Sequence, residues 1–361
     1  MTILPESEDH FHQLSETGAY EWSYFDGVSD DGQWGFVAIW FRGAPLSPWY
    51  SAAVERALRR GEALPPLRHC AFHFSLFHRG KRIYSAQHER DGESFHTDYR
   101  TPDVRLRDNS LYANAIPAGG THYAISVDTE FPRQTSRVVG EIAIRSEHQE
   151  LKPLLESQLE SQMPRPHVQH FWVPAALAGN FTAELGLWRL AGGTKRISFG
   201  GRAYHDRNFG TEPLHHLPGN WLRGHAHSGE RTFLYFHVGG LDTRPQFQHA
   251  LLLEKGTIVA QASSLTLVQA DPKKKRWGIG HAGILHGTSK ELEFTVTPRW
   301  CVDAGPLCHR SIQSITVRQQ GAQWPEQTME GVGIGEVLRP DRAAVGWIRP
   351  LVKFGARRTR E

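Results

Sequence analysis

The sequence has few cysteines and no long apolar run, and both absences limit what the chain can be. Its three cysteines, Cys70, Cys301 and Cys308, are scattered and form no CxxC pair. An odd, widely spaced set argues against a disulfide framework and against a zinc knuckle. The longest apolar runs, such as residues 36–41 (FVAIWF), are too short to span a bilayer. We therefore expect a soluble protein with reduced cysteines.

Targeting signals and a strong charge of one sign are also missing. The first residues, MTILPESEDHFHQ, contain neither a basic start nor an apolar core, which predicts a cytoplasmic location. The formal net charge is only +3, and basic residues gather only in residues 273–276 (KKKR) and in the final KFGARRTR. These two runs predict solvated segments with at most a weak attraction to anionic lipid. No nucleic-acid-binding motif is present, so we expect no nucleic-acid partner.

Common catalytic motifs are absent as well. The sequence has no GxSxG and no HExxH, and residues 331–335 (GVGIG) resemble a phosphate loop without the strand and helix that such a loop needs. The 21 histidines, including HAH at residues 225–227, keep zinc under consideration, but two imidazoles on one strand face supply no third ligand. We expect neither a metal ion nor a cofactor, and a histidine metalloenzyme is the least favoured hypothesis.

What the sequence does contain is aromatic residues and short strands. It has 11 Trp, 18 Phe and 9 Tyr, which can line a cavity or fill a core. Most of the chain consists of short apolar stretches between Gly, Pro, Asn and Asp, without the helix alternation of βαβ units, which is typical of a sandwich or barrel. Two hairpins are expected over residues 20–41, turning at residues 30–32, and over residues 69–87, turning at Arg79 and Gly80. Further strands are expected at residues 122–127, 137–145, 181–190, 233–239, 250–253, 258–267, 278–287 and 291–298.

Two helices interrupt the strands. Leucines at helical spacing after residue 150 predict a connecting helix that begins near Pro153 and ends before Pro164. A second helix is expected over residues 51–60 (SAAVERALRR). The connecting helix divides two strand-rich halves of nearly equal length, so we place a domain boundary near residue 165.

Two carboxylates lie among aromatic residues. Asp26 ends WSYFD, where strand alternation puts Trp22, Tyr24 and Asp26 on one face. Asp206 lies in residues 204–210 (YHDRNFG). A carboxyl group in an apolar pocket can stay protonated near neutrality and protonate an alkene, and aromatic walls would attract the resulting cation. Taken alone, however, the residue types favour a turn at Asp206 and a turn-capping role for Asp26.

Several segments together resemble the carotenoid 1,2-hydratase (hydroxyneurosporene synthase) family and its lipocalin-like relatives. In chain order the segments are YEWSYFDGVSDDGQWG, LSPWY, RHCAF, QHFWVP, GRAYHDRNFGTEPL and GVGIGEVLRPDRAAVGWIRPLV. The resemblance implies an all-β fold of two tandem lipocalin-like β-barrels, with residues 1–165, including the connecting helix, in one domain and residues 166–361 in the other. It also implies a hydrophobic polyene substrate and chemistry without a cofactor.

The resemblance assigns a role to Asp206. The hydratases carry a catalytic aspartate in the segment that matches residues 204–213, and it falls on Asp206. By this analogy Asp206 protonates the terminal C=C bond of an acyclic carotenoid, and water captures the cation at C1. From the local chemistry we expect Tyr204, His205 and Asn208 to position the acid or the water. The expected substrate-binding residues are Trp22, Tyr24, Asp26 and Trp221.

Two departures from the family leave the substrate class open. His205 stands where the hydratases tend to have an aromatic residue, and NWLRGHAH is more polar than its counterpart. A cyclase or pericyclic enzyme of another polyene, using His205 and Asp206, is therefore an alternative, and a noncatalytic carrier of a lipophilic ligand is another. Because a long polyene has to come from lipid, we also expect peripheral contact with the inner membrane.

Overall fold

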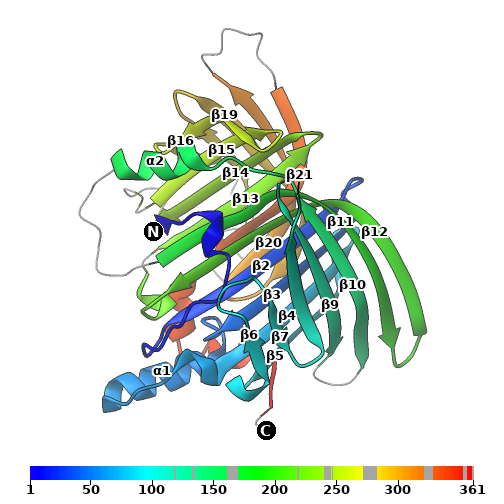
Figure 1. The fold of residues 1–361 in the computed structure, drawn as a ribbon, viewed down its shortest axis with the longest axis vertical. Coiled ribbons are helices and arrows are strands. Elements are labelled where there is room, and N and C mark those ends of the chain that lie inside the picture. Colours follow the sequence, from blue (N-terminus) through cyan, green and yellow to red (C-terminus); the bar gives the residue numbers. More distant parts are fainter. Residues whose placement is uncertain are drawn as a thin grey trace.

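Two curled β-sheets make up most of the molecule, and they pack against each other (Figure 1). The computed structural model describes residues 1–117, 119–131, 135–160, 170–217, 219–239, 245, 247–270, 283–320, 328–352 and 356–359. In these residues the fold is the all-β, two-barrel architecture expected from the sequence, with each sheet forming an open half-barrel. No helix within the described ranges has the length and apolar character needed to cross a membrane.

The first sheet has thirteen strands in the described part of the chain. Its order is β22-β5-β4-β3-β2-β12-β11-β10-β9-β8-β7-β6, and β1 pairs with β11. The strands are β1 Thr2–Ile3, β2 Tyr20–Ser29, β3 Trp34–Arg42, β4 Cys70–His78, β5 Lys81–Arg90, β6 Phe95–Thr97, β7 Val104–Leu106, β8 Asn109–Ala115, β9 Thr121–Glu130, β10 Ser136–Ser146, β11 His170–Arg189, β12 Gly193–Gly210 and β22 Ala356–Arg358. Strands β2 and β12 are therefore paired neighbours at the centre of the sheet, although they come from opposite ends of its sequence.

The second sheet has nine described strands in the order β16-β15-β14-β13-β21-β20-β19-β18-β17. They are β13 Asn220–Ser228, β14 Arg231–Gly239, β15 Phe247–Glu254, β16 Thr257–Ala262, β17 Thr266–Ala270, β18 Ile284–Thr288, β19 Leu292–Ala304, β20 Cys308–Gln319 and β21 Thr328–Leu338. The helices are α1 Pro48–Arg60, α2 Lys152–Glu160 and α3 Arg349–Val352, with 3-10 turns η1 Glu6–Glu8, η2 Pro66–His69, η3 Gly92–Ser94, η4 Leu214–His216 and η5 Pro340–Ala344.

The locally encoded elements agree with the sequence expectations. Both hairpins form, as β2–β3 and β4–β5, and Arg79 and Gly80 turn the second with positive φ angles of 48° and 71°. Helix α1 covers the expected segment and is capped by the Ser47 side chain. Helix α2 has Pro153 in its first turn, where the missing N–H is tolerated.

Three expectations about local structure are wrong. Residues 204–210 form the end of β12 and not a turn, because they pair with β2 on one side and β11 on the other. Asp26 lies inside β2 and not at a turn, and its carboxylate contacts the Tyr24 hydroxyl and His225. The strand expected at residues 258–267 is divided into β16 and β17.

The position of the domain boundary stays a prediction. Residue 165 and Pro164 lie outside the described residues, as do the KKKR run and the first part of the strand expected at residues 278–287. The described sheets divide later in the chain, since β11 and β12 belong to the first sheet and the second begins with β13.

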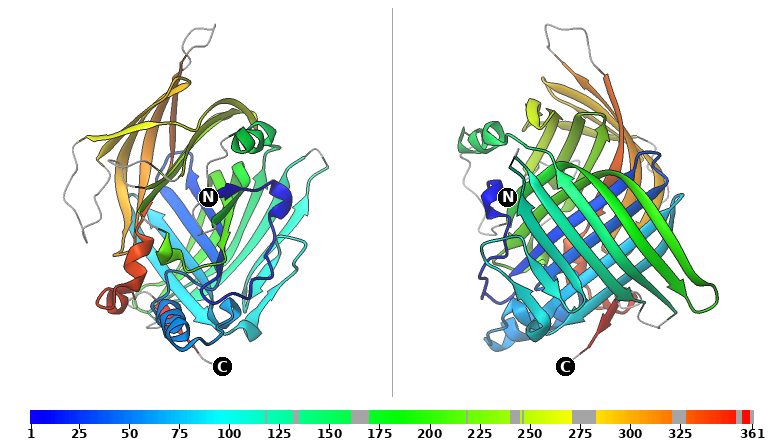
Figure 2. Two further views of the ribbon diagram at one scale, coloured as in Figure 1. Left: turned by 90° about the vertical axis from the view of Figure 1, so that its left-hand side faces the viewer. Right: turned by 45° about the vertical axis from the view of Figure 1, so that its right-hand side comes forward.

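The centre of the first sheet is covered on both faces. One face encloses a core that includes Phe25, Phe36 and Trp40 within the first half-barrel. The opposite face packs on the second sheet through a core that includes Trp172 and Phe236. Every residue of β2 is consequently buried, and its alternate side chains enter two different environments. The N-terminal segment lies along the concave side of the first sheet (Figure 2).

Candidate functional site

Alternation along β12 sends the expected catalytic residues to two sides of the first sheet. Tyr204, Asp206 and Asn208 face the second sheet, whereas His205 and Arg207 face the interior of the first half-barrel. The structure thus brings together three of the four expected catalytic residues and separates His205 from them. Trp22, Tyr24, Asp26 and Trp221 all lie on the same side as Asp206.

Asp206 is fully buried and receives three hydrogen bonds on one oxygen. Trp172 Nε1 donates to Oδ2 at 3.0 Å, the Tyr204 hydroxyl donates at 2.8 Å and Arg223 Nη1 donates at 2.9 Å. Oδ1 has no hydrogen-bond partner in the described part of the chain. Burial and the adjacent Asp206 carboxyl raise the pKa of Tyr204 well above its usual value, so its phenol remains a donor.

Arg223, on β13, connects the two sheets at this point. Its Nε donates to Glu336 Oε2 at 2.7 Å, and its guanidinium lies 3.9 Å from the centre of the Tyr24 ring. Glu336 also accepts a hydrogen bond from Arg310 Nε. Burial by itself would raise the pKa of Glu336, but the two guanidiniums more than offset it and hold that pKa at about 2. Glu336 is therefore ionised near neutral pH, and Arg223 is shared between it and Asp206.

A second carboxylate, Asp26, anchors a line of imidazoles. His225 Nε2 lies 3.0 Å from Asp26 Oδ2, and its Nδ1 lies 3.1 Å from His227 Nε2. His227 Nδ1 contacts the Thr232 hydroxyl at 2.9 Å, and burial lowers the pKa of His227 far below its usual value. The Tyr24 hydroxyl donates to Asp26 Oδ2 at 2.8 Å. The His225 ring also stacks on Tyr204, which donates to Asp206, so the histidines and Asp206 are neighbours in the site.

Asn208 positions a third histidine. Its Oδ1 lies 3.1 Å from His170 Nε2, and His170 Nδ1 lies 2.8 Å from the Tyr20 hydroxyl. Burial lowers the pKa of His170 to about 3. The neutral His170 ring also makes an edge contact with Trp221, so Asn208 helps to position the aromatic side chains of the cavity. Within the described residues it makes no contact with Asp206.

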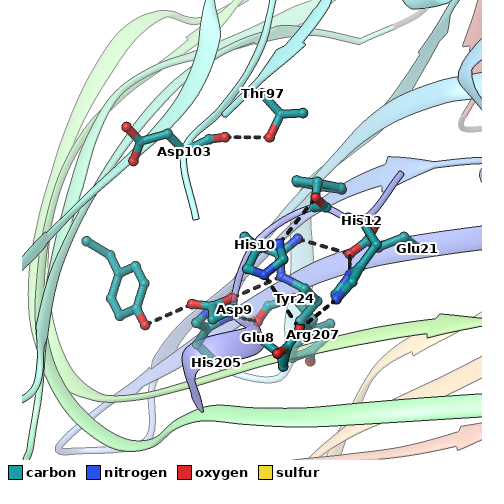
Figure 3. Close-up of polar contacts among 12 residues, drawn as sticks. Glu8, Asp9, His10, His12, Glu21, Tyr24, Thr97, Asp103, His205 and Arg207 are labelled. Atoms are coloured by element: carbon teal, nitrogen blue, oxygen red, sulfur yellow. Dashed lines mark hydrogen bonds and ion pairs between the residues drawn. The ribbon is translucent and has the colours of Figure 1, made fainter. Parts of the chain in front are cut away.

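On the other side of β12, His205 belongs to the first half-barrel (Figure 3). Its ring stacks on Phe25 with ring centres 3.8 Å apart, and its Nε2 lies 3.0 Å from Asp9 Oδ2. Arg207 Nε donates to Asp9 Oδ1 at 3.0 Å. His205 therefore helps to hold the N-terminal segment against the first sheet, through its contact with Asp9.

Three neighbouring cavities, which share part of their lining, lie beside the residues that surround Asp206. An outer groove of about 760 Å³ and an inner cavity of about 60 Å³ share Ile39, Phe41 and Leu46 among their lining residues. The inner cavity is lined mainly by apolar and aromatic side chains, including those of Trp22, Tyr24, Trp221 and Phe236, and also by Asn208, Arg223, Arg310 and Glu336. A third space of about 10 Å³ lies deeper, among Asp26, Tyr204, Arg223, His225 and Glu336. Its size is close to what one water molecule needs.

The charged groups of this region come from both sheets. Asp26, Asp206 and Glu336 supply three carboxyl groups, and Arg223 and Arg310 supply two guanidiniums. Arg310 also lies 3.6 Å from Asp303, which in turn pairs with Arg82.

Sequence reasoning missed the side chains that other strands bring to this site. Trp172 on β11 and Arg223 on β13 contact Asp206, and Glu336 on β21 links Arg223 to Arg310 on β20. A signal was present in NWLRGHAH, where alternation places Trp221, Arg223, His225 and His227 on one face of β13.

The structure shows a lipocalin-like fold of two half-barrel sheets, with an aromatic cavity and a buried acidic cluster between them. No family model matches the chain. It is 26% identical over 353 residues to a hydroxyneurosporene dehydrogenase from Chlorobaculum tepidum, covering 94% of this chain and 88% of that protein. It is 30% identical over 221 residues to the acyclic carotenoid 1,2-hydratase of Thiocapsa roseopersicina, covering 60% of this chain and 47% of that protein. The chain is thus similar to proteins of carotenoid metabolism, as the sequence segments predicted.

Solved structures confirm the fold. A protein described as AttH from Nitrosomonas europaea superposes with a TM-score of 0.55 at 15% identity, covering 92% of this chain and 95% of that one. CghA in complex with Sch210972 superposes with a TM-score of 0.53 at 14% identity, covering 89% and 88%. At these identities the likeness concerns the arrangement of strands alone.

Proposed function

We propose that this protein hydrates a terminal isoprenoid C=C bond of an acyclic carotenoid without a cofactor, with Asp206 as the general acid. The observation that carries the proposal is the asymmetric environment of Asp206. All three donors meet Oδ2 and fix the orientation of the carboxyl group, whereas Oδ1 has no described hydrogen-bond partner and is the oxygen that would deliver the proton. The similarity to carotenoid 1,2-hydratases supports the choice of substrate class.

The reaction balances with the groups present. Asp206 gives its proton to C2 of the terminal double bond, and the positive charge forms at the tertiary C1. The faces of Trp22, Tyr24 and Trp221 attract that cation. A water molecule from the small polar space adds to C1 and loses a proton to His225, which Asp26 orients. The proton then returns to Asp206, and the substrate has gained one water.

The cavity sizes suit one end of a long substrate. The inner cavity of about 60 Å³ accepts only a chain terminus, whereas the outer groove of about 760 Å³ can hold more of a polyene. A terminal double bond would therefore reach the acidic cluster while the conjugated chain stays in the groove.

The first test uses purified protein, an acyclic carotenoid with a terminal isopropylidene group and isotopically labelled water. We expect the product to gain one labelled water. Asp206→Asn should lower the rate about 100-fold or more, because the amide cannot deliver a proton. Asp128→Asn, which removes a carboxylate paired with Arg137 on the first sheet, is the matched control and should leave the rate unchanged.

The other outcomes separate the alternatives. A product that loses two hydrogens would identify a dehydrogenase, the activity in the name of the Chlorobaculum relative. A rearranged product of unchanged mass would favour the cyclase. Tight binding of the polyene without any product would favour the carrier, and each of these results would refute the hydratase proposal.

A further inference from the structure

Three metal-ligating side chains meet in the N-terminal segment (Figure 3). They lie on the His205 side of the first sheet, away from Asp206. Glu8 is the last residue of η1, and His10 and His12 follow at alternate positions. One ligand atom from each lies within 4.8 Å of the others, and all three side chains are partly buried. Among the described residues this is the one such group of three.

The two separations between Glu8 and the histidines suit a small tetrahedral metal ion. Glu8 Oε2 lies 3.3 Å from His12 Nε2 and 3.5 Å from His10 Nε2. Bonds of about 2.0–2.2 Å to zinc place two tetrahedral ligand atoms about 3.3–3.5 Å apart. A carboxylate and two neutral imidazoles are also ligand types that zinc commonly takes.

The surroundings orient both imidazoles toward this point. His12 Nδ1 lies 2.9 Å from Oε1 of Glu21, a fully buried carboxylate on β2, and the His12 ring stacks on Phe209 of β12. His10 Nδ1 lies 3.4 Å from the Phe11 carbonyl oxygen. In each ring the Nδ1 position is therefore occupied by an acceptor, and Nε2 is left for Glu8 or for a metal. A buried carboxylate behind a histidine is the usual second partner of a zinc-bound imidazole.

We propose that Glu8, His10 and His12 bind one zinc ion, with solvent at the fourth position. The ion would fasten the N-terminal segment to β2 through Glu21 and to β12 through Phe209. Asp9 lies between the ligands and holds both His205 and Arg207, so zinc would also fix these contacts inside the first half-barrel. This site is independent of the hydration chemistry, which takes place on the opposite face of β12.

The test is calorimetric titration of the full chain with zinc chloride at neutral pH, after treatment with a chelator and its removal. We expect one zinc ion per chain. His10→Ala should weaken binding at least 100-fold, and Glu21→Gln should weaken it about 10–100-fold because it removes the charge behind His12 while all three ligands remain. His216→Ala is the matched control. It removes one imidazole of the consecutive pair His215–His216 in η4 and should bind zinc as the wild type does.

Glu8→Gln is a second variant that should still fold if His10→Ala does not, because the Glu8 side chain is partly exposed and the substitution keeps its size. It should retain the wild-type melting temperature without zinc and lose most of the rise in melting temperature that zinc gives. X-ray absorption of the zinc complex should show only nitrogen and oxygen ligands near 2.0–2.2 Å. The proposal is overturned by the absence of stoichiometric zinc, by equal affinity in the wild type, His10→Ala and Glu8→Gln, or by a sulfur ligand.

Discussion

At the scale of single residues, the site depends on buried charges that neutralise one another. Arg223 contacts two carboxyl groups from different strands and lies over an aromatic ring, so its charge is compensated in a region that is largely shielded from bulk solvent. Removing one member of such a group leaves another charge buried without compensation, which costs about 3–5 kcal/mol. The same cluster that serves the proposed chemistry therefore also holds the sheets together.

Glu336 provides a pH-dependent measure of that cluster. Its pKa is about 2 in the folded chain and would return to about 4.5 on unfolding. Because the folded pKa is the lower one, its stabilisation is complete above about pH 4.5 and is lost as the pH falls toward 2. Glu336→Gln should thus lower the free energy of unfolding at pH 6 by about 3–5 kcal/mol, and this difference should shrink between pH 4.5 and pH 3.

Urea denaturation at pH 6, 4.5 and 3 would measure the effect. Glu254→Gln is the control, since its exposed ion pair with Arg231 should contribute only about 0–1 kcal/mol at any of these pH values. A difference between wild type and Glu336→Gln that stays constant from pH 6 to pH 3 would contradict the assignment.

At the scale of elements, the turn of the β4–β5 hairpin also touches the second sheet. Gly80 has a φ of 71°, and a Cβ atom there would lie 2.4 Å from Cγ of Trp300 on β19. Gly61, which ends α1, has a similar φ of 65° but nothing within 4 Å. Gly61→Ala should therefore cost only the backbone strain, about 1–2 kcal/mol, whereas Gly80→Ala should cost an additional 1–3 kcal/mol or so. Thermal or urea unfolding would measure the loss in free energy of unfolding for each variant. Equal losses in the two variants would show that the Trp300 side chain moves aside at little cost.

The sequence predicts elements whose signals are local and misses those that depend on pairing. The β2–β3 and β4–β5 hairpins carry aromatic strands and turn residues within one short segment, so they were predictable. Residues 204–210 carry Asp, Asn and Gly, which favour turns, and they are held in β12 by pairing with β2, which is far away in sequence. The site partners are hidden for the same reason. Asp206 was found through resemblance, whereas Arg223 contacts it, and brings Glu336 into the cluster, only once the two sheets pack together.

At the scale of the whole molecule, access to the acidic cluster passes between the sheets. Leu46 is half-buried and lines both the outer groove and the inner cavity, so a larger side chain there should narrow the connection. Leu46→Trp should weaken binding of a long acyclic carotenoid about tenfold or more. Quenching of tryptophan fluorescence by the polyene, corrected for the added indole, would measure it.

Leu58→Trp on the exposed side of α1 is the matched control, since it adds the same indole away from the passage. It should leave carotenoid affinity unchanged. Equal affinities for the wild type and Leu46→Trp would mean that the substrate enters by another route.

The alternation of β12 has a consequence for how its gene can change. A deletion of one codon between residues 193 and 203 would shift every later side chain of the strand to the opposite face. The carboxyl of Asp206 would then enter the first half-barrel, while the cationic side chain of Arg207 would face the aromatic cavity. Such a deletion would place the wrong side chains in both interiors at once. We therefore expect in-frame deletion scanning to find no tolerated single-residue deletion over residues 193–203, even at positions where the side chain itself can be replaced.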